Sequence, residues 1–267
     1  MTIAALDVVA GVATAVAAGS PFLLLCDFDG TLSPTADHPH LAAVLPRARS
    51  ALVRLAARAG CHVGIVSGRS LDDLAGIVGI PFRYLAGSGG LELLCDGRRL
   101  VPPGYREAVV LMASVVDDVR REMAGFDGVW VEAKDCAVTI HHRDAPAPSV
   151  LAAREVAAAV ARRHDWRCRV IEGSLGIEMT AFPKRDKSSA VRFFRRRAGG
   201  KQVRICYCGN DGNDAPAMAF VNACGGWSLG VGPAAPSEAR CVLANPAALS
   251  EFLATLADAV DSRPPYQ

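Results

Sequence analysis

Short apolar runs that end in small or polar residues, each followed by a helical pattern, constrain the fold of this chain most. Residues 22–26, 61–66 and 203–208 are such runs, and they lead into an Asp, a Ser and a Gly. Short buried strands that alternate with helices predict a parallel, doubly wound sheet of the α/β class. Because the carboxyl ends of parallel strands meet at one edge of a sheet, the polar residues that follow these runs are expected to lie together there.

The middle of the chain has a different pattern. A hairpin with an Asp-Gly turn is predicted at 91–100, ahead of helices and of strands with alternating apolar residues. The helices are expected at 105–124 and 150–164, and the strands at 129–132, 137–142, 168–172 and 176–180. We therefore predict a Rossmann-like core made of residues 1–94 and 182–267, with an α+β cap domain inserted at 95–181.

Composition excludes several classes of protein. The 267 residues are 51% hydrophobic and 21% charged, with a formal net charge of +2. These values fit neither a disordered chain nor the basic surface of a nucleic-acid-binding protein. No uninterrupted apolar run reaches the ~18 residues of a membrane-spanning helix, so no membrane partner is expected. The nine cysteines include no Cys-x-x-Cys pair and are interpreted as small buried residues of a cytoplasmic protein.

The Ala- and Val-rich residues 1–20 are open to two interpretations, a signal peptide or a helix packed on the body of the protein. We favour the helix, because no Lys or Arg precedes the apolar residues and Asp7 interrupts them. The apolar run that follows leads directly into an acidic segment on which the proposed chemistry depends.

That segment is Asp27-Phe28-Asp29-Gly30-Thr31-Leu32. Two carboxylates two residues apart on an extended segment point to the same side, where their repulsion calls for a cation or a proton between them. Ligands that offer only oxygen favour Mg²⁺ over zinc. One carboxylate can then act as a nucleophile and form an aspartyl-phosphate. The other can protonate the leaving oxygen and later deprotonate water.

Residues 27–32 resemble the first motif of the haloacid-dehalogenase-like phosphatases, and three further segments resemble that family's other motifs in the right order. Ser67 matches the phosphate-binding Ser or Thr, Lys187 matches the phosphate-neutralising Lys, and residues 209–214 match the acidic metal motif. The resemblance implies Mg²⁺ as cofactor, Asp27 as nucleophile and Asp29 as general acid and base. It implies phosphate contacts from Thr31, Ser67, Gly68, Arg69 and Lys187, and metal ligands among Asp27, Asp29, Asn210, Asp211 and Asp214. Which of the last three binds the metal directly stays open.

The resemblance narrows to the trehalose-6-phosphate phosphatases. Residues 87–92, the segment Glu132-Ala133-Lys134, the segment Ile140-His141-His142-Arg143, and Glu178 ahead of Asp186-Lys187 are similar to motifs of that family. This similarity implies sugar contacts from Glu92, Lys134, Arg143 and Glu178. Two alternatives stay open, in which Arg143 is a solvated residue at a strand end and Glu92 pairs locally with Arg98 or Arg99. His141 and His142 adjoin each other on a strand, so we expect one to be exposed and the other to be packed.

Several positions depart from that family's pattern. Gly89 stands where the family usually has His, and Thr180 and Ala181 replace a basic residue and Pro. Ser188 replaces the Gly after Lys187, and the last motif reads Gly-Asn-Asp-Gly-Asn-Asp rather than Gly-Asp-Asp-x-Thr-Asp. The residues expected to handle phosphate are intact, so these departures bear on the identity of the sugar.

The resemblance implies Mg²⁺-dependent hydrolysis of a sugar phosphate through an aspartyl-phosphate, with trehalose 6-phosphate as the first choice of substrate. The alternatives are another trehalose-like or glycosyl phosphate (a pseudo-disaccharide, sucrose-type or glycosylglycerate-type phosphate), a phosphomutase, and a silent sensor domain. The intact pair of aspartates argues against the sensor. We expect a cytoplasmic monomer whose partner is a small sugar phosphate.

Overall fold

The structure is a computed structural model that describes residues 3–36, 38–165, 167–173, 176–182 and 184–262. The chain divides into two compact units, which we call the larger unit (Met1–Leu100 and Asp186–Gln267) and the smaller unit (Val101–Arg185). The sequence placed the boundaries at 94/95 and 181/182. The first structural boundary falls later because both strands of the hairpin at 91–100 join the sheet of the larger unit.

Within the described residues, the larger unit contains an eight-stranded sheet of order β12-β11-β10-β1-β2-β3-β4-β5. Neighbouring strands from β12 to β3 pair in parallel, whereas β4 is antiparallel to β3 and β5 is antiparallel to β4. In chain order the strands are β1 (Phe22–Cys26), β2 (Cys61–Val66), β3 (Tyr84–Gly87), β4 (Glu92–Cys95), β5 (Arg98–Leu100), β10 (Arg204–Gly209), β11 (Trp227–Val231) and β12 (Cys241–Leu243).

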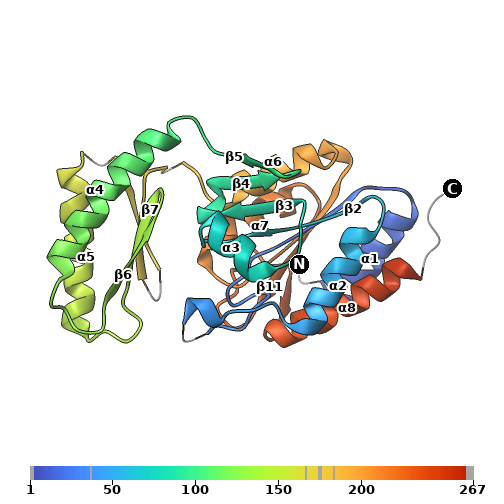
Figure 1. Cartoon of the computed structure of the whole chain (residues 1–267). Coiled ribbons are helices and arrows are strands. Elements are labelled where there is room, and N and C mark those ends of the chain that lie inside the picture. The colour runs from blue at the N-terminus through green and yellow to red at the C-terminus, as the bar shows by residue number, and fades with distance from the viewer. Residues whose placement is uncertain (1–2, 37, 166, 174–175, 183, 263–267) are drawn as a thin grey trace. The chain divides into compact units, whose positions relative to one another are not determined.

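Helices cover both faces of this sheet (Figure 1). One face packs on α1 (Ala5–Ala17), α2 (Pro46–Ala57), α3 (Leu71–Val78) and α8 (Pro246–Asp261), and the other packs on α6 (Lys187–Arg197) and α7 (Ala215–Ala223). Short 3-10 turns lie at Pro39–Leu41, Ser88–Gly90, Gly200–Gln202 and Gly212–Asp214. In β1, Leu24 faces the first group of helices while Leu23 and Leu25 face the second. Burial on both sides explains why this strand is apolar at every position.

Two features predicted from local sequence are confirmed in the larger unit. The hairpin turns at Asp96 and Gly97, whose φ angles are 52° and 75°, as a two-residue turn between antiparallel strands requires. The N-terminal segment forms α1, which buries Val8, Val9 and Val12 against the rest of the unit. In the described part of the chain, no helix combines the length and the apolar character needed to cross a bilayer.

The smaller unit has an antiparallel sheet, in which the described strands follow the order β6-β7-β9-β8. Its elements are α4 (Tyr105–Met123), β6 (Trp130–Lys134), β7 (Ala137–His141), α5 (Ala147–Arg163), β8 (Arg169–Glu172) and β9 (Gly176–Thr180). Val138, Ile140, Ile177 and Met179 project from one face of the sheet into a core shared with α4 and α5. The predicted doubly wound α/β core with an inserted α+β segment is thus confirmed.

Candidate active site

The loop after β1 is folded tightly. The backbone N–H groups of Thr31, Leu32 and Ser33 all donate to the carbonyl of Phe28, at 3.3, 3.0 and 3.0 Å. Gly30 has a φ of +75°, and a Cβ at this position would collide with the Asn210 side chain. Both the backbone conformation and this close approach require glycine. The loop therefore brings residues 27–31 against the end of β10.

Asp27 lies in a buried network of charges. The Lys187 ammonium donates to Asp27 Oδ1 and to Asp214 Oδ1, at 2.7 Å each. The exposed fractions of the Lys187, Asp27 and Asp214 side chains are 4%, 6% and 0%. Lys187 is the first residue of α6, which begins there because the Asp186 side chain accepts the Ser188 N–H as an N-cap. Helix capping thus fixes the cation that neutralises Asp27.

Because one ammonium is shared between two buried carboxylates, the pKa values of both Asp27 and Lys187 lie above their ordinary values. Burial raises the pKa of Asp27 to about 7; Lys187 lowers it in part, and Asp214 raises it again. Burial acts to lower the pKa of Lys187, but the Asp214 and Asp27 carboxylates raise it above its ordinary value. Lys187 therefore stays protonated at neutral pH, and the Asp27 and Asp214 carboxylates share its charge.

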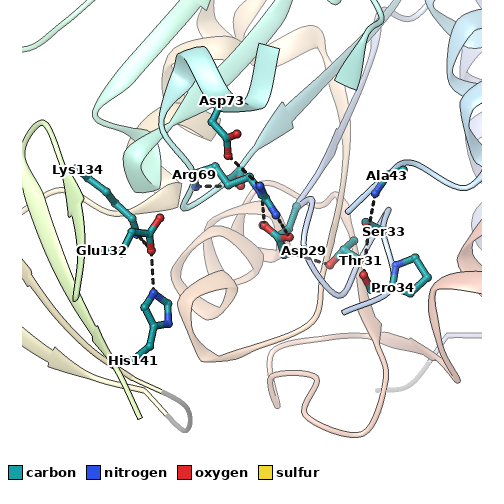
Figure 2. A network of polar contacts seen from close by, with 12 residues as sticks. Asp29, Thr31, Ser33, Pro34, Ala43, Arg69, Asp73, Glu132, Lys134 and His141 are labelled. Atoms are coloured by element: carbon teal, nitrogen blue, oxygen red, sulfur yellow. Dashed lines mark hydrogen bonds and ion pairs between the residues drawn. The ribbon is translucent and has the colours of Figure 1, made fainter. Parts of the chain in front are cut away.

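Asp29 has a different cation as its partner. Arg69, which is 8% exposed, donates from Nε to Asp29 Oδ2 and from Nη2 to Asp29 Oδ1, at 2.7 Å each, and from Nη1 to Asp73 at 2.8 Å (Figure 2). Burial acts to lower the pKa of Arg69, but its hydrogen bonds to Asp29 raise it above its ordinary value. The sequence called for a cation or a proton between the two carboxylates. Each carboxylate also has a side-chain cation of its own, Lys187 for Asp27 and Arg69 for Asp29.

Ser67 and Gly68 lie where β2 ends, as predicted. Ser67 is buried and its Oγ accepts the backbone N–H of Arg69 at 3.2 Å. Gly68 has open space on the side where a Cβ would stand. Thr31, also buried, donates to Asp27 Oδ2 at 3.2 Å. Thr31 thus contacts the Asp27 carboxylate, and Ser67 lies at the end of the strand that neighbours β1.

In the acidic motif after β10, Asp214 and Asp211 make different contacts. Asp214 Oδ2 accepts the N–H groups of Asn210 and Asp211 at 2.9 and 3.3 Å, and Oδ1 accepts the Tyr207 hydroxyl at 2.7 Å in addition to Lys187. Asp211 accepts the N–H of Asn213 at 2.9 Å and caps the turn Gly212–Asp214. Burial raises the pKa of Asp211, and Lys187 lowers it in part. Asp214 thus uses both of its oxygens to hold the loop and Lys187.

Asn210 faces the aspartates. In one orientation of the Asn210 amide, Oδ1 accepts the Thr31 hydroxyl at 3.3 Å. In the other, the amide nitrogen takes that place and lies 3.0 Å from Asp27 Oδ2, 3.1 Å from the carbonyl oxygen of Asp29 and 3.3 Å from Thr31 Oγ1. A cation held between these groups would favour the orientation that presents Oδ1. A carboxylate, a carbonyl and a side-chain amide are hard oxygen donors of the kind that Mg²⁺ accepts. Among the described residues, no three His, Cys, Asp or Glu side chains form a cluster that could hold a metal. The donor set at Asn210 fits Mg²⁺ with one carboxylate and neutral oxygens.

The predicted sugar-binding residues are divided between the two compact units. In the smaller unit, Lys134 Nζ lies 3.1 Å from Thr139 Oγ1, 3.5 Å from Glu178 Oε2 and 3.6 Å from Glu132 Oε2. Arg143 is exposed in the turn after β7, and no hydrogen bond or ion pair to it is found among the described residues.

Glu92 lies in the larger unit, fully buried at the start of β4, where it accepts Ser88 Oγ at 2.7 Å and pairs with Arg99. The open alternative of a local pair with Arg99 is therefore observed. The structure thus places Glu92 and the pair of Lys134 and Glu178 in different compact units.

Three further residues of these clusters were not singled out in the sequence. Tyr207 is fully buried in β10 and holds Asp214; a Tyr within an apolar run was the available signal, because a buried phenol needs a hydrogen-bond partner. Trp130 and Thr139 share a sheet face with Glu132 and Lys134, which only the strand register reveals. Of the two neighbouring histidines, His142 is buried and His141 is half-buried.

The larger unit has a doubly wound core with an acidic loop after β1, a Ser after β2, a capped Lys at the start of α6 and an acidic turn after β10. This is the arrangement expected from the resemblance to the haloacid-dehalogenase-like hydrolases. A hydrolase of that class from Bacteroides thetaiotaomicron matches the fold with a TM-score of 0.61 at 15% identity, over 87% of this chain and 98% of its own. The C-terminal domain of the trehalose-6-phosphate phosphatase of Candida albicans matches with a TM-score of 0.77 at 20% identity, over 93% of this chain and 96% of its own.

Comparison of the amino-acid sequence with known families identifies the family. The model of the trehalose-phosphatase family matches residues 25–232. The trehalose-phosphate phosphatase of Mycobacterium avium (strain 104) is 36% identical over 250 residues, which cover 88% of this chain and 62% of that protein. The chain belongs to the trehalose-phosphatase family, as predicted. It spans about 62% of the length of that relative.

Proposed function

We propose that this chain is a phosphoric monoester hydrolase that converts trehalose 6-phosphate to trehalose and phosphate and depends on Mg²⁺. The observation that supports it most is the arrangement around the two aspartates. Asp27 is buried against Lys187, and Asp29, 47% exposed, is oriented by Arg69. A buried carboxylate and an accessible one suit the separate roles of nucleophile and general acid.

The proposed reaction has two steps. A carboxylate oxygen of Asp27 attacks phosphorus, the bond from phosphorus to the sugar oxygen breaks, and Asp29 delivers a proton to that oxygen. Water then attacks the phosphorus of the aspartyl-phosphate and gives its proton to Asp29, which releases phosphate and restores the Asp27 carboxylate. Thr31, Ser67, Gly68, Arg69 and Lys187 would bind the phosphoryl oxygens, and their positive charge and donors offset the charge of the transition state.

The residues that would hold Mg²⁺ are Asp27, the carbonyl of Asp29 and the side-chain oxygen of Asn210. When bound, the metal neutralises charge on the phosphoryl group. Asp211 is a further candidate ligand for Mg²⁺, because capping the turn occupies only one of its carboxylate oxygens. Asp214 contributes by positioning Lys187, since its oxygens are already occupied. We therefore propose Asn210 as a direct metal ligand and Asp214 as a residue that supports the site from behind.

Sugar recognition is proposed for the smaller unit, through Lys134 and Glu178 with Glu132 beside them. Charged groups that can share hydrogen bonds with several hydroxyls give selectivity among sugars. Arg143, exposed in the turn after β7, remains a proposed contact to the sugar. The cytoplasm is the proposed location, because the nine cysteines are free thiols, which a reducing compartment preserves.

The test is phosphate release, with Mg²⁺ present, from trehalose 6-phosphate, sucrose 6-phosphate, a glycosylglycerate phosphate and glucose 6-phosphate. We expect the largest kcat/KM for trehalose 6-phosphate and no requirement for a bisphosphate activator, which a phosphomutase would need. The variant Asp27→Asn serves as the control for a contaminating phosphatase. Absence of release from every disaccharide phosphate would overturn the proposal.

A further inference from the structure

One face of the sheet in the smaller unit is polar and carries a single large aromatic side chain. The strand register places Trp130, Glu132 and Lys134 of β6 beside His141 and Thr139 of β7 on this face. On the neighbouring strand β9, Glu178 lies directly opposite Thr139 of β7 and therefore on the same face. Since alternate residues of these strands fill the core against α4 and α5, the polar face is the side of the sheet that those helices leave uncovered.

Trp130 is unusually open for an indole in a folded protein. Its ring stacks on that of His141, with centroids 3.7 Å apart and planes 12° from parallel. Although His141 covers one ring face, 48% of Trp130 is exposed. Trp130 belongs to β6, which is an edge strand of the described sheet. As far as the described residues extend, the exposed area of the ring is therefore its second face and its edge. An exposed aromatic side chain on an edge strand is typical of a binding surface.

The indole is tied to the carboxylate next to it through His141. Nε2 of His141 lies 2.8 Å from Glu132 Oε2, and Lys134 Nζ lies 3.6 Å from the same oxygen (Figure 2). Among the described residues, Oε1 of Glu132 accepts no hydrogen bond. The pKa of Glu132 is lower than usual: burial acts to raise it, and the His141 hydrogen bond and the Lys134 charge outweigh that effect. Glu132 is thus an oriented carboxylate with one oxygen that no described residue occupies.

An apolar ring face beside an oriented carboxylate and an ammonium matches the chemistry of a pyranose. Such a ring has C–H groups on a face that stacks on an aromatic plane, and hydroxyls at its rim that donate to carboxylates. We propose that Trp130 is a specificity-determining residue, whose open face packs against a pyranose ring of the substrate beside the Glu132 carboxylate. This inference rests on the proposed function and names a contact that selects its substrate.

His141 positions Trp130 and Glu132 and is not itself expected to contact the sugar. It touches both Trp130 and Glu132 and keeps the indole plane and the carboxylate in a fixed relation. His141 is accordingly a positioning residue. Replacement by Gln retains a side-chain N–H that can reach Glu132, whereas replacement by Ala retains neither the stack nor the hydrogen bond.

The experiment compares kcat/KM for trehalose 6-phosphate with kcat/KM for 4-nitrophenyl phosphate, which has no pyranose. Trp130→Ala is expected to lower the ratio of the two values about fivefold or more, through a higher KM for trehalose 6-phosphate. Trp130→Phe keeps a stacking ring and is expected to lower the ratio less. The matched control is Phe126→Ala, which removes an aromatic that is 39% exposed in the same unit but outside the polar face, and it should leave the ratio unchanged.

For His141, we expect the KM for trehalose 6-phosphate to rise in His141→Ala and to be partly restored in His141→Gln. A ratio that Trp130→Ala changes no more than Phe126→Ala does would overturn the assignment of Trp130. Circular dichroism of each variant shows whether the sheet is intact; if Trp130→Ala is misfolded, Trp130→Phe and His141→Gln decide. Failure of the proposed function is distinguishable, because then the unaltered protein itself would not prefer trehalose 6-phosphate.

Discussion

Lys187, Asp27 and Asp214 meet inside the larger unit with side chains at most 6% exposed, whereas Glu132 and Glu178 on the smaller sheet are 34% and 36% exposed. The first group joins elements far apart in the sequence, β1, α6 and the turn after β10. The second lies within three neighbouring strands. Burial makes each interaction of the first group strong and each lost partner costly. Water around the second group leaves its charges free to exchange partners with a ligand.

This contrast fits the two tasks proposed for the molecule. Phosphoryl transfer needs charges held rigidly where charge develops, and the buried network supplies them. Recognition of a sugar needs groups that give up water in favour of hydroxyls, and the half-exposed face supplies those. The following predictions test the contrast, in order of decreasing effect.

Asp27→Asn should abolish turnover of trehalose 6-phosphate, with a loss on the order of 10³-fold or more. The amide is a far weaker nucleophile, yet it keeps the shape of the side chain and can still contact Lys187. Steady-state phosphate release measures the loss, and thermal unfolding monitors the fold. More than a few per cent of residual activity in a folded variant would contradict the role of Asp27.

Lys187→Met should destabilise the protein by about 3–5 kcal/mol, because Asp27 and Asp214 would remain buried without their shared cation. Urea unfolding at neutral pH measures this. The matched control is Lys134→Met. The Lys134 side chain is itself 10% exposed, but the carboxylates it leaves behind, Glu132 and Glu178, are 34% and 36% exposed and can be solvated, so the loss should be smaller, about 1 kcal/mol. Equal losses in the two variants would remove the distinction drawn between the two groups.

Asp118 tests whether a buried charge in the smaller unit behaves like those of the larger one. It joins α4 to α5, accepting Arg121, Arg163 and His164 at 2.8, 3.1 and 3.0 Å. Burial acts to raise its pKa, but the hydrogen bonds from Arg163 and His164 outweigh burial, and the pKa lies below its ordinary value of 3.8.

A carboxyl whose pKa is depressed by folding contributes stability above its unfolded pKa and loses it as the pH falls through the folded value. The stabilisation from Asp118 should therefore be complete at neutral pH and decline below about pH 4. Asp118→Asn should lower the free energy of unfolding at pH 7 by about 1–3 kcal/mol. The free energy of unfolding of the variant should also fall less steeply as the pH is lowered below about 4. Parallel acid limbs for the variant and the unaltered protein would disprove this.

Asn210→Asp is expected to have the smallest effect, about a tenfold tighter affinity for Mg²⁺, because an added carboxylate raises the charge of the ligand set. In the absence of Mg²⁺ the same variant should melt at a lower temperature, since the new carboxylate would face Asp27 Oδ2 and could not donate to it. Calorimetric titration with Mg²⁺ and thermal unfolding with a chelator provide the readouts. An unchanged affinity would show that Asn210 does not contact the metal.

The parts of the fold that local sequence could specify were predictable. The strand β1 is apolar throughout because both of its faces are buried, and the hairpin turns at Asp96-Gly97 because that pair tolerates positive φ. The loop after β1 was recognisable from Asp27, Asp29 and Gly30, which act within a few residues of one another. Family membership followed from the same short segments and their order along the chain, although the sheet places the last of them, after β10, directly beside the first, after β1.

What the sequence left open depended on contacts between distant residues. Arg69 and Lys187 were both expected to bind phosphate, but only the packing of β2 and α6 shows that Arg69 pairs with Asp29 and Lys187 with Asp27. Asp214 could not be separated from Asn210 as a metal ligand until the bonds from Lys187 and Tyr207 were seen. The stack of Trp130 on His141 likewise depends on strand register. Turns, caps and buried runs are decided by neighbours in the chain, whereas the choice of partner for each charge is decided by tertiary packing, because the long side chains involved can reach several partners and burial selects one.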